Sequence, residues 1–365
     1  MKITGIIAEY NPFHNGHKFQ IENSGADATV VVMSGNFVQR GAPAIWNKWK
    51  RAEYAVKNGA DLVLELPCDF ALASAERFAY GGVFILNSLG LIDTITFGAE
   101  NNLKDLEKTL NELSVASIPD LMHKKEGLSY HEARNLAVSD KSVLNKPNNI
   151  LGIEYLKALR NLNSKIIPTP VLRTGVMHHD SNPNGNFASA SFIREEILAR
   201  RDVNDYIPYL IPNAKHLAVD NFYELISYKI LNENISDIGE VREGIENRFL
   251  KGISQCKSFD ELVLFAKSKR FTYTSVSRML MQILLNIKKS DLCNFPQYTR
   301  VLGANEKGRE ILAKARKTSK IPIITKGSDA KDIPEFQLDV KAGNIYSLIE
   351  KTPINQDLLM MPYIE

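Results

Sequence analysis

Short apolar runs alternate with longer amphipathic stretches over the first 172 residues. The runs are rich in Val, Ile and Leu and occupy Lys2–Ala8, Ala28–Met33, Ala60–Leu66, Ile92–Phe97 and Ile166–Leu172. Such runs are typical of parallel strands, because helices cover both faces of a parallel sheet. The stretches between them, such as 46–58 and 70–89, carry apolar residues at helical intervals. This alternation predicts an α/β fold with a doubly wound parallel sheet.

The pattern changes after residue 200, where apolar residues recur at helical spacing. Phe222–Leu231 and Ser277–Ile287 are examples. The change predicts two domains, a sheet domain of residues 1–200 and a mainly helical domain of residues 201–365. At 365 residues, the chain is long enough for each domain to bury its own core.

The loop after the first predicted strand is the main candidate for chemistry. Pro12 lacks the N–H of a strand ladder, so the strand ends before it, and the loop then reads His14-Asn15-Gly16-His17 into a helix. Two histidines three positions apart share one face of a helical turn. The helix start adds unpaired N–H groups and a positive dipole end, which suit a phosphate. The arrangement predicts that both histidines stabilise charge on a phosphoryl group.

A plainer account is that the two histidines are surface residues or half of a zinc site. The flanking proline and glycine favour the phosphate account, and the loop resembles the H-x-G-H signature of the nucleotidyltransferase superfamily. That resemblance assigns a phosphate contact to Lys48, which follows the second strand. Solvated surface is otherwise the usual location of residues such as Lys48, Lys50 and Arg51. Between strand and helix, Phe37–Pro43 (FVQRGAP) is too polar for a regular element and is predicted to be an active-site loop.

Ala188–Arg194 (ASASFIR) is a second phosphate candidate. It has the pattern of a helix start in which Ser189 or Ser191 caps the backbone. It also resembles the superfamily motif I-S-S-T-x-x-R, whose hydroxyls and arginine hold the β- and γ-phosphates, with departures at three positions. The resemblance assigns the arginine role to Arg194 and leaves open which hydroxyl takes part.

Polar or small residues at the ends of two later strands and one helix are further candidates. Gly98 follows the fourth strand, at the edge where open α/β sheets bind ligands, and is either a turn glycine or a point where a nucleoside approaches the backbone. Arg173 follows the fifth strand. Asn148 and Asn149 precede an apolar helix, and capping that helix is their commoner role.

Composition is ordinary for a globular protein, with 24% charged and 44% hydrophobic residues. No charged leader precedes an apolar run and no apolar segment approaches membrane-spanning length, so the chain is predicted to be cytoplasmic and without a membrane partner. Cys68, Cys256 and Cys293 are odd in number and far apart, and the adjacent His178 and His179 point in different directions. No disulfide framework and no metal site are predicted.

Positive charge is concentrated in one region, although the whole chain carries only +3. Residues 262–326 contain 14 Lys and Arg but 3 acidic residues, and aromatic residues interleave with the cations. A solvated basic face is the plain account. So large an excess of positive charge beside a nucleotide site favours nucleic acid as the partner, because its phosphates attract clustered cations. The candidate contacts are Lys269, Arg270, Tyr273, Arg278 and Arg300.

The chain is similar to the bacterial tRNA(Met) cytidine acetate ligase family. The motifs that carry the resemblance are, in order, EYNPFHNGH, MSGNFVQRG, KPNNILG and ASASFIR, followed by KRFTYTSVSRML and LDVKAGNIYS. The resemblance implies that acetate and ATP form acetyladenylate and pyrophosphate. The acetyl group then passes to the N4 amine of the wobble cytidine of elongator tRNA(Met), giving N4-acetylcytidine.

The same resemblance implies the site residues of a catalytic domain within 1–200. His14 and His17 would stabilise the α-phosphate transition state, while Lys48 and Arg194 would hold the outgoing pyrophosphate. For Asn148 it replaces capping with an ATP contact. The full set of implied ATP contacts is Ile7, Ala8, Glu9, Tyr10, Asn11, Pro12, Phe13, His14, Asn15, Gly16, His17, Lys18, Phe19, Gln20, Gly98, Asn148, Arg173, Ser189 and Ser191.

Two other classes of protein fit part of the sequence. A small-molecule adenylyl- or cytidylyltransferase of coenzyme biosynthesis would share the first domain and leave the basic region unexplained. A non-catalytic tRNA-binding module would have no need of intact His14, Gly16, His17 and Arg194. The sequence defines neither a Mg²⁺ requirement nor an oligomeric state.

Overall fold

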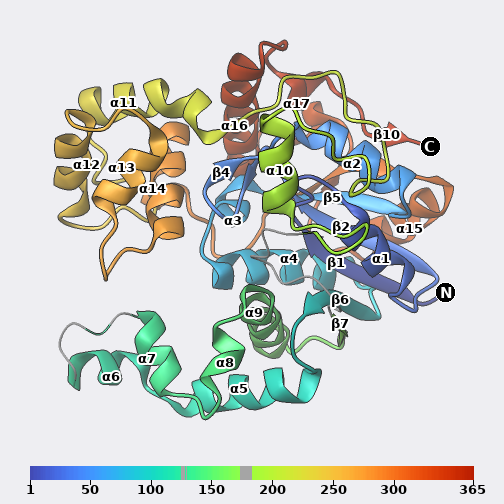
Figure 1. Ribbon diagram of the computed structural model, residues 1–365. Helices are drawn as coiled ribbons and strands as arrows, with labels where there is room; N and C mark the ends of the chain where they lie inside the picture. The colour runs from blue at the N-terminus through green and yellow to red at the C-terminus, as the bar shows by residue number, and fades with distance from the viewer. Residues whose placement is uncertain (125–127, 129, 173–182) are drawn as a thin grey trace.

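The computed structural model describes residues 1–124, 128, 130–172 and 183–365, and its centre is a mixed sheet of eight strands (Figure 1). Five strands are parallel and lie in the order β5, β2, β1, β6, β7. They are β1 (Ile3–Ala8), β2 (Ala28–Ser34), β5 (Leu62–Leu66), β6 (Thr94–Ala99) and β7 (Ile167–Leu172). All five predicted strands and the doubly wound arrangement are confirmed.

Helices cover both faces of the sheet, as the continuous apolar runs predicted. On one face Ile6, Val31 and Met33 pack against α1 (Asn15–Glu22) and α2 (Lys48–Lys57). On the other face the alternate strand residues pack against α4 (Ala75–Leu89), α9 (Pro147–Asn161) and α15 (Glu306–Thr318). The β2 strand is therefore buried along its whole length.

Two helical parts extend from this core (Figure 1). The segment between β6 and α9 forms α5 (Leu103–Val115), α6 (Ile118–Lys124), α7 (Tyr130–Leu136) and α8 (Lys141–Leu144). The second part, here called the helical unit, comprises α11 (Tyr223–Asn232), α12 (Ile245–Ile253), α13 (Phe259–Ala266) and α14 (Tyr273–Leu285). Every residue from Val276 to Leu285 is buried, so α14 is the central helix of this unit. The short 3-10 helix η1 (Val219–Phe222) leads into it.

The predicted boundary of a separate domain at 201–365 is wrong, because the chain returns to the sheet after the helical unit. Strand β8 (Thr299–Ala304) pairs antiparallel with β5, while β9 (Ile323–Ile324) and β10 (Tyr363–Ile364) pair parallel with β8. The last helices are α16 (Pro334–Glu350) and α17 (Gln356–Leu359), after η2 (Lys289–Asp291) and η3 (Gly327–Ala330). The sheet core thus contains both ends of the chain.

The predicted loop at 37–43 is also corrected, because it forms a small hairpin. Strand β3 (Phe37–Val38) pairs antiparallel with β4 (Ala42–Pro43), and α3 (Cys68–Ala71) packs beside β3. Gly41 has φ +80°, and a Cβ there would collide with the backbone of Arg278 in α14. The hairpin turn is therefore fixed against the helical unit. None of the described helices is both long and apolar enough to cross a membrane.

Candidate active site

A cavity of about 530 Å³ opens at the carboxyl ends of β1 and β6. Its other walls come from the first turns of α1 and α9 and from α10 (Ala190–Leu198), which are far apart in the sequence. Thr274 of the helical unit also lines it. The site is therefore placed where an open α/β sheet is expected to bind a ligand.

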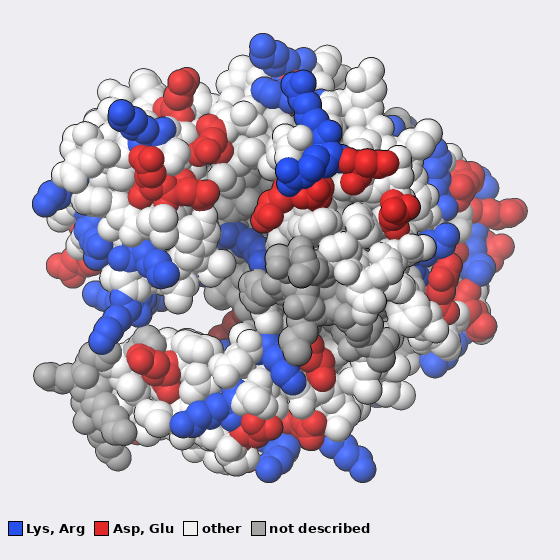
Figure 2. Space-filling view, viewed as in Figure 1, with Lys and Arg blue, Asp and Glu red and all other residues white. Residues whose placement is uncertain are grey.

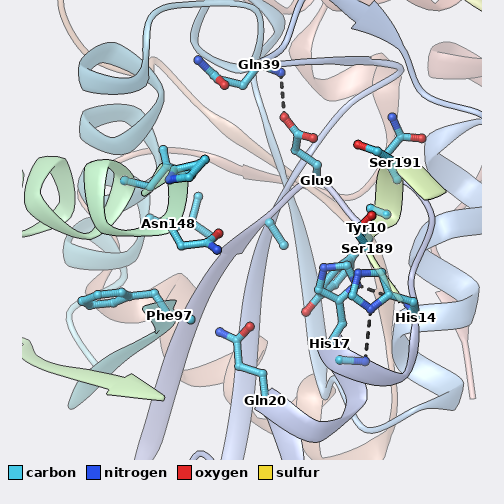
Figure 3. A pocket seen from close by; sticks show the side chains of 18 of the residues that line it. Glu9, Tyr10, His14, His17, Gln20, Gln39, Phe97, Asn148, Ser189 and Ser191 are labelled. Carbon is cyan, nitrogen blue, oxygen red and sulfur yellow. Dashed lines mark hydrogen bonds between the residues drawn. The ribbon is translucent and has the colours of Figure 1, made fainter. Parts of the chain in front are cut away.

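His14 and His17 form a closed hydrogen-bonded pair at the start of α1 (Figure 3). The Nδ1 atom of His14 accepts the N–H of Gly16 at 3.1 Å, and Nδ1 of His17 accepts the N–H of His14 at 3.2 Å. The rings stack with their centroids 3.7 Å apart. Since each Nδ1 accepts a backbone proton, the proton of a neutral ring lies on Nε2. The pair is thus built to offer two Nε2–H donors.

Gly16 leaves room for the His14 ring between the two histidines. A Cβ at Gly16 would lie 3.0 Å from Cε1 of His14, within the ring that caps the helix. The turn before it contains a cis peptide bond between Asn11 and Pro12. The buried guanidinium of Arg51 supports this turn by donating to the carbonyl of Glu9 at 2.6 Å.

The second phosphate candidate lies beside the histidine loop (Figure 3). Ser189 caps α10 by accepting the N–H of Phe192 at 3.2 Å. Arg194 donates to the carbonyl of Asn11 at 2.6 Å and to Oγ of Ser191 at 3.2 Å. Burial lowers the pKa of Arg194, and the nearby Arg40 lowers it further, while Glu9 raises it. Two guanidinium groups that share one cavity favour an anion there.

The opposite end of the cavity is less charged. Phe97 and Asn148 lie there, and Gln20 lies between them and the histidines in the close view (Figure 3). Gly98 follows Phe97 in β6 and also lines the cavity. The predicted caps of α9 are wrong, because α9 begins at Pro147 and its N-cap Lys146 makes no side-chain cap bond. Asn148 instead donates from Nδ2 to Oε1 of Glu100 at 2.6 Å.

The structure brings most of the predicted nucleotide contacts to this cavity. Those that line it are Ile7, Ala8, Glu9, Tyr10, Asn11, His14, Gly16, His17, Phe19, Gln20, Gly98, Asn148, Ser189, Ser191 and Arg194. Pro12, Phe13, Asn15 and Lys18 belong to the same segment but are not among the lining residues. Phe13 packs in the core beneath the loop. Arg173, like His178 and His179, lies outside the described residues.

The predicted phosphate contact of Lys48 is wrong, because Lys48 does not line the cavity. Its side chain is buried and its ammonium donates to the carboxylates of Glu65 and Asp357. Burial opposes the charge, but Asp357 and Glu65 together outweigh it and raise the pKa of Lys48. Arg51 is buried as well, so the expectation of a solvated position fails for Arg51, whereas Lys50 pairs at the surface with Glu53. Lys48 is a structural cation in this fold.

Two of the predicted tRNA contacts, Arg300 and Arg278, are wrong, because both side chains are buried. Arg300 lies in β8, is fully buried and donates to the backbone carbonyls of Asp357 and Met360. Arg278 is 7% exposed and forms a forked pair with Glu240. Neither guanidinium is available to a phosphate backbone. In contrast, Lys269 and Arg270 are exposed, and Tyr273 is 37% exposed.

Sequence reasoning missed several residues of the cavity. Gln39 and Arg40 come from the turn of the β3–β4 hairpin, Thr274 from α14 and Phe187 from the segment before α10. The first two belong to the 37–43 segment, which the sequence predicted to be an active-site loop without naming single residues. Nothing in the local sequence indicated Thr274, because it reaches the cavity only through the packing of α14 on the hairpin.

A possible metal cluster lies outside the cavity. Within the described part of the chain, one cluster of three groups able to hold a metal ion was found, formed by Asp69, Cys293 and Glu335. None of the three lines the cavity. The cysteines are all free.

Comparisons with known proteins agree with this geometry. The model of the HIGH nucleotidyl transferase family matches residues 1–359. A tRNA(Met) cytidine acetate ligase of Clostridium perfringens is 42% identical over 401 residues, covering 100% of both chains. One of the same name from Caldanaerobacter subterraneus is 40% identical over 387 residues, covering 96% of both.

Solved structures give the same result at the level of the fold. Thermotoga maritima TmcAL in an apo form superposes with a TM-score of 0.91 at 32% identity, covering 100% of this chain and 99% of that one. The form bound with alpha-thio ATP gives a TM-score of 0.89 at 31% identity with the same coverage. The chain therefore belongs to the tRNA(Met) cytidine acetate ligase family of HIGH nucleotidyltransferases.

Proposed function

We propose that the protein is an ATP-dependent acetate ligase that acts on elongator tRNA(Met) in the cytoplasm. The observation that carries the proposal is the stacked pair of His14 and His17 at the start of α1, which lines the same cavity as Arg194. Family membership and the nucleotide complex of TmcAL support ATP as the occupant.

In the first step a carboxylate oxygen of acetate attacks the α-phosphorus of ATP. The new bond is a mixed anhydride, and the bond from phosphorus to the pyrophosphate oxygen breaks. Negative charge on the phosphoryl oxygens meets the histidine donors and the N-terminal N–H groups of α1. Arg194 and the hydroxyl of Ser191 are placed for the leaving pyrophosphate.

In the second step the N4 amine of the wobble cytidine attacks the acetyl carbonyl. AMP leaves with its phosphate, and the amine loses one proton. This step requires that the cytidine reaches the cavity. The helical unit borders the cavity, because Thr274 of α14 lines it. Lys269, Arg270 and Tyr273 lie on the chain leading into α14 and are proposed as tRNA contacts.

The space-filling view supports a path for RNA beside the cavity. A hollow separates the helical unit from the α5–α8 segment, and Lys and Arg side chains lie on both of its sides (Figure 2). Clustered cations beside an opening suit a phosphate backbone.

Isotope exchange tests the first step. Labelled pyrophosphate is expected to exchange into ATP only when acetate is added, with no need for tRNA. Exchange that depends on a nucleotide precursor of a coenzyme, and not on acetate, would instead indicate a small-molecule adenylyl- or cytidylyltransferase. Omission of Mg²⁺ in the same assay measures the metal requirement.

Mass spectrometry of tRNA nucleosides tests the second step. After incubation with ATP and acetate, N4-acetylcytidine is expected in elongator tRNA(Met) and not in other tRNAs. Acetate-dependent exchange without any acetylated cytidine would contradict the proposed acceptor.

A further inference from the structure

We propose that Glu100 and Asn149 are positioning residues that fix the amide of Asn148. In this arrangement Oδ1 of Asn148 accepts a hydrogen bond from the nucleoside part of the nucleotide. Asn148 lines the cavity, whereas Glu100 and Asn149 do not. The inference rests on the proposed function, since it takes ATP as the occupant.

Glu100 determines which way the Asn148 amide points. One carboxylate oxygen of Glu100 accepts Nδ2 of Asn148 at 2.6 Å, and the other accepts the backbone N–H of Asn149 at 3.1 Å. An ionised carboxylate only accepts hydrogen bonds, so the Asn148 atom that faces it is the NH₂ group. Turning the amide by 180° would place two oxygens against each other. The amide orientation of Asn148 is thereby fixed.

Asn149 holds Glu100 in place. The Asn149 side chain is fully buried, and its Oδ1 accepts the N–H groups of Glu100 and Asn101 at 2.9 and 3.1 Å. Its Nδ2 donates to Oδ1 of Asn101 and to the carbonyl of Val143 at 2.9 and 3.3 Å. Both acceptor positions and both donor hydrogens are in use. The loop after β6 is therefore tied to the first turn of α9.

The remaining acceptor of Asn148 is Oδ1, which faces the cavity. Among the described residues no donor contacts its Oδ1, and the side chain points into the cavity beside Phe97 (Figure 3). This end lies away from His14 and His17, so a nucleotide with its α-phosphate at the histidines has its nucleoside here. A nucleoside carries donors of two kinds, the exocyclic amine of adenine and the ribose hydroxyls. An oxo group in place of the donor would meet the Oδ1 lone pairs and be rejected.

Nucleotide titration calorimetry of the full chain tests this positioning. The ligands are ATP, ITP, 2′-deoxy-ATP and 3′-deoxy-ATP, and the variant is Glu100→Gln, which keeps the size of the side chain but has one acceptor oxygen. The matched control is Glu107→Gln, because Glu107 is exposed on α5 and remote from the amide network. Glu100→Gln is expected to weaken ATP binding about tenfold, and the control less than twofold.

The decisive result is the pattern across the ligands. The loss of affinity caused by Glu100→Gln is expected to disappear for the analogue that lacks the donor contacted by Asn148. That analogue is ITP if the donor is the base amine, and one of the two deoxy-ATPs if the donor is a ribose hydroxyl. The loss is also expected to disappear when Asn148→Ala is already present. An equal penalty for all four nucleotides, or an undiminished penalty in the Asn148→Ala background, would overturn the proposal.

A second variant keeps the test decisive if Glu100→Gln does not fold. Asn149→Asp retains an acceptor for both loop N–H groups but sets a carboxylate oxygen against the acceptors of Asn101 and Val143, so it loosens the loop that carries Glu100 and is expected to give the same ligand pattern. Binding is measured without acetate, so the proposed function can fail separately. Wild-type protein that binds ATP but gives no acetate-dependent exchange contradicts the ligase function alone, whereas absence of ATP binding overturns both.

Discussion

His14 has two tasks that a single substitution would mix. In the proposed reaction its imidazole donates to the phosphoryl group, and in the structure its Nδ1 caps α1 through the N–H of Gly16. Loss of a catalytic donor lowers the reaction rate, whereas loss of a helix cap lowers the stability of the fold.

Replacing His14 by Asn and by Ala separates these tasks. Asn is a good N-cap, so His14→Asn is expected to keep the melting temperature near that of wild type. His14→Ala is expected to lose about 0.5–2 kcal/mol of stability. Both are expected to slow acetate-dependent pyrophosphate exchange by about 10²- to 10³-fold. Calorimetry beside the exchange assay measures the two effects, and normal exchange by His14→Asn would remove the histidine from the chemistry.

Lys48 is expected to act on stability instead of chemistry. Lys48→Ala leaves the buried carboxylate of Glu65 without its cation and Asp357 with Arg300 alone, which costs about 3–5 kcal/mol. Lys50→Ala in the same helix is the control, because its pair with Glu53 is at the surface and worth under about 1 kcal/mol. Denaturant unfolding measures both values. A Lys48→Ala protein of normal stability but without exchange activity would restore the phosphate role.

At the scale of elements, the basic stretch of 262–326 separates into two surfaces. Lys269 and Arg270 precede α14, close to the cavity residue Thr274. Lys314 and Lys317 are exposed on α15, whose N-terminal turn packs against Asp61 at the opposite end of β5. Only the first surface is near the nucleotide.

Salt-dependent tRNA binding distinguishes the two surfaces. Replacing Lys269 and Arg270 together by Ala is expected to weaken tRNA binding and to flatten the slope of log K against log salt by about 0.7–0.9 for each lost phosphate contact. The double replacement of Lys314 and Lys317 by Ala is the control, with less effect expected. Acetate-dependent exchange is expected to stay near wild type in both. If the first pair bound tRNA with an unchanged slope, the RNA contacts would lie elsewhere.

The contact between α3 and α16 gives a prediction for pH. Glu335 lies beside Asp69, and burial together with that carboxylate raises the pKa of Glu335 to about 10. A raised carboxyl pKa means stability that is complete below about 4.5 and is lost as pH rises towards 10. Glu335→Gln has no charge to gain, so its melting temperature minus that of wild type is expected to increase from pH 5 to pH 9. A constant difference across this range would show that Glu335 stays ionised in the folded protein.

Some elements are specified by their own residues, and the sequence predicted these. Others depend on partners far away in the sequence, and these were missed or misassigned. Strands such as β2 are specified locally, because an unbroken β-branched run has few alternatives. Strand β8 carries Arg300 within a basic region, and its burial depends on Asp357, 57 residues later. The His14 loop and α10 were recognisable from motifs, whereas Lys48 was misassigned because its partners Glu65 and Asp357 are distant in sequence.

At the scale of the whole molecule, the sheet core is discontinuous in sequence. Strand β5 pairs with β2 on one side and with β8 on the other, so residues 1–200 alone leave one side of β5 unpaired. They also leave Lys48 without Asp357.

A fragment of residues 1–200 is therefore expected not to fold into an ATP-binding domain. Adding residues 291–365 as a separate chain is expected to restore structure in part, since these residues supply β8 and Asp357. Circular dichroism, limited proteolysis and ATP titration measure the outcome. A compact fragment of residues 1–200 that binds ATP would show that the pairing of β5 with β8 is dispensable.

The late pairing of β8 has a consequence during translation. A ribosome completes residues 1–200 roughly 5–20 seconds before β8 at ordinary synthesis rates. During that interval the nascent chain exposes an apolar β5 edge with unpaired backbone groups, which invites pairing with other chains. The order of synthesis thus allows the cavity to form only after the helical unit has been made, and we expect the partly made protein to need protection from association during that interval.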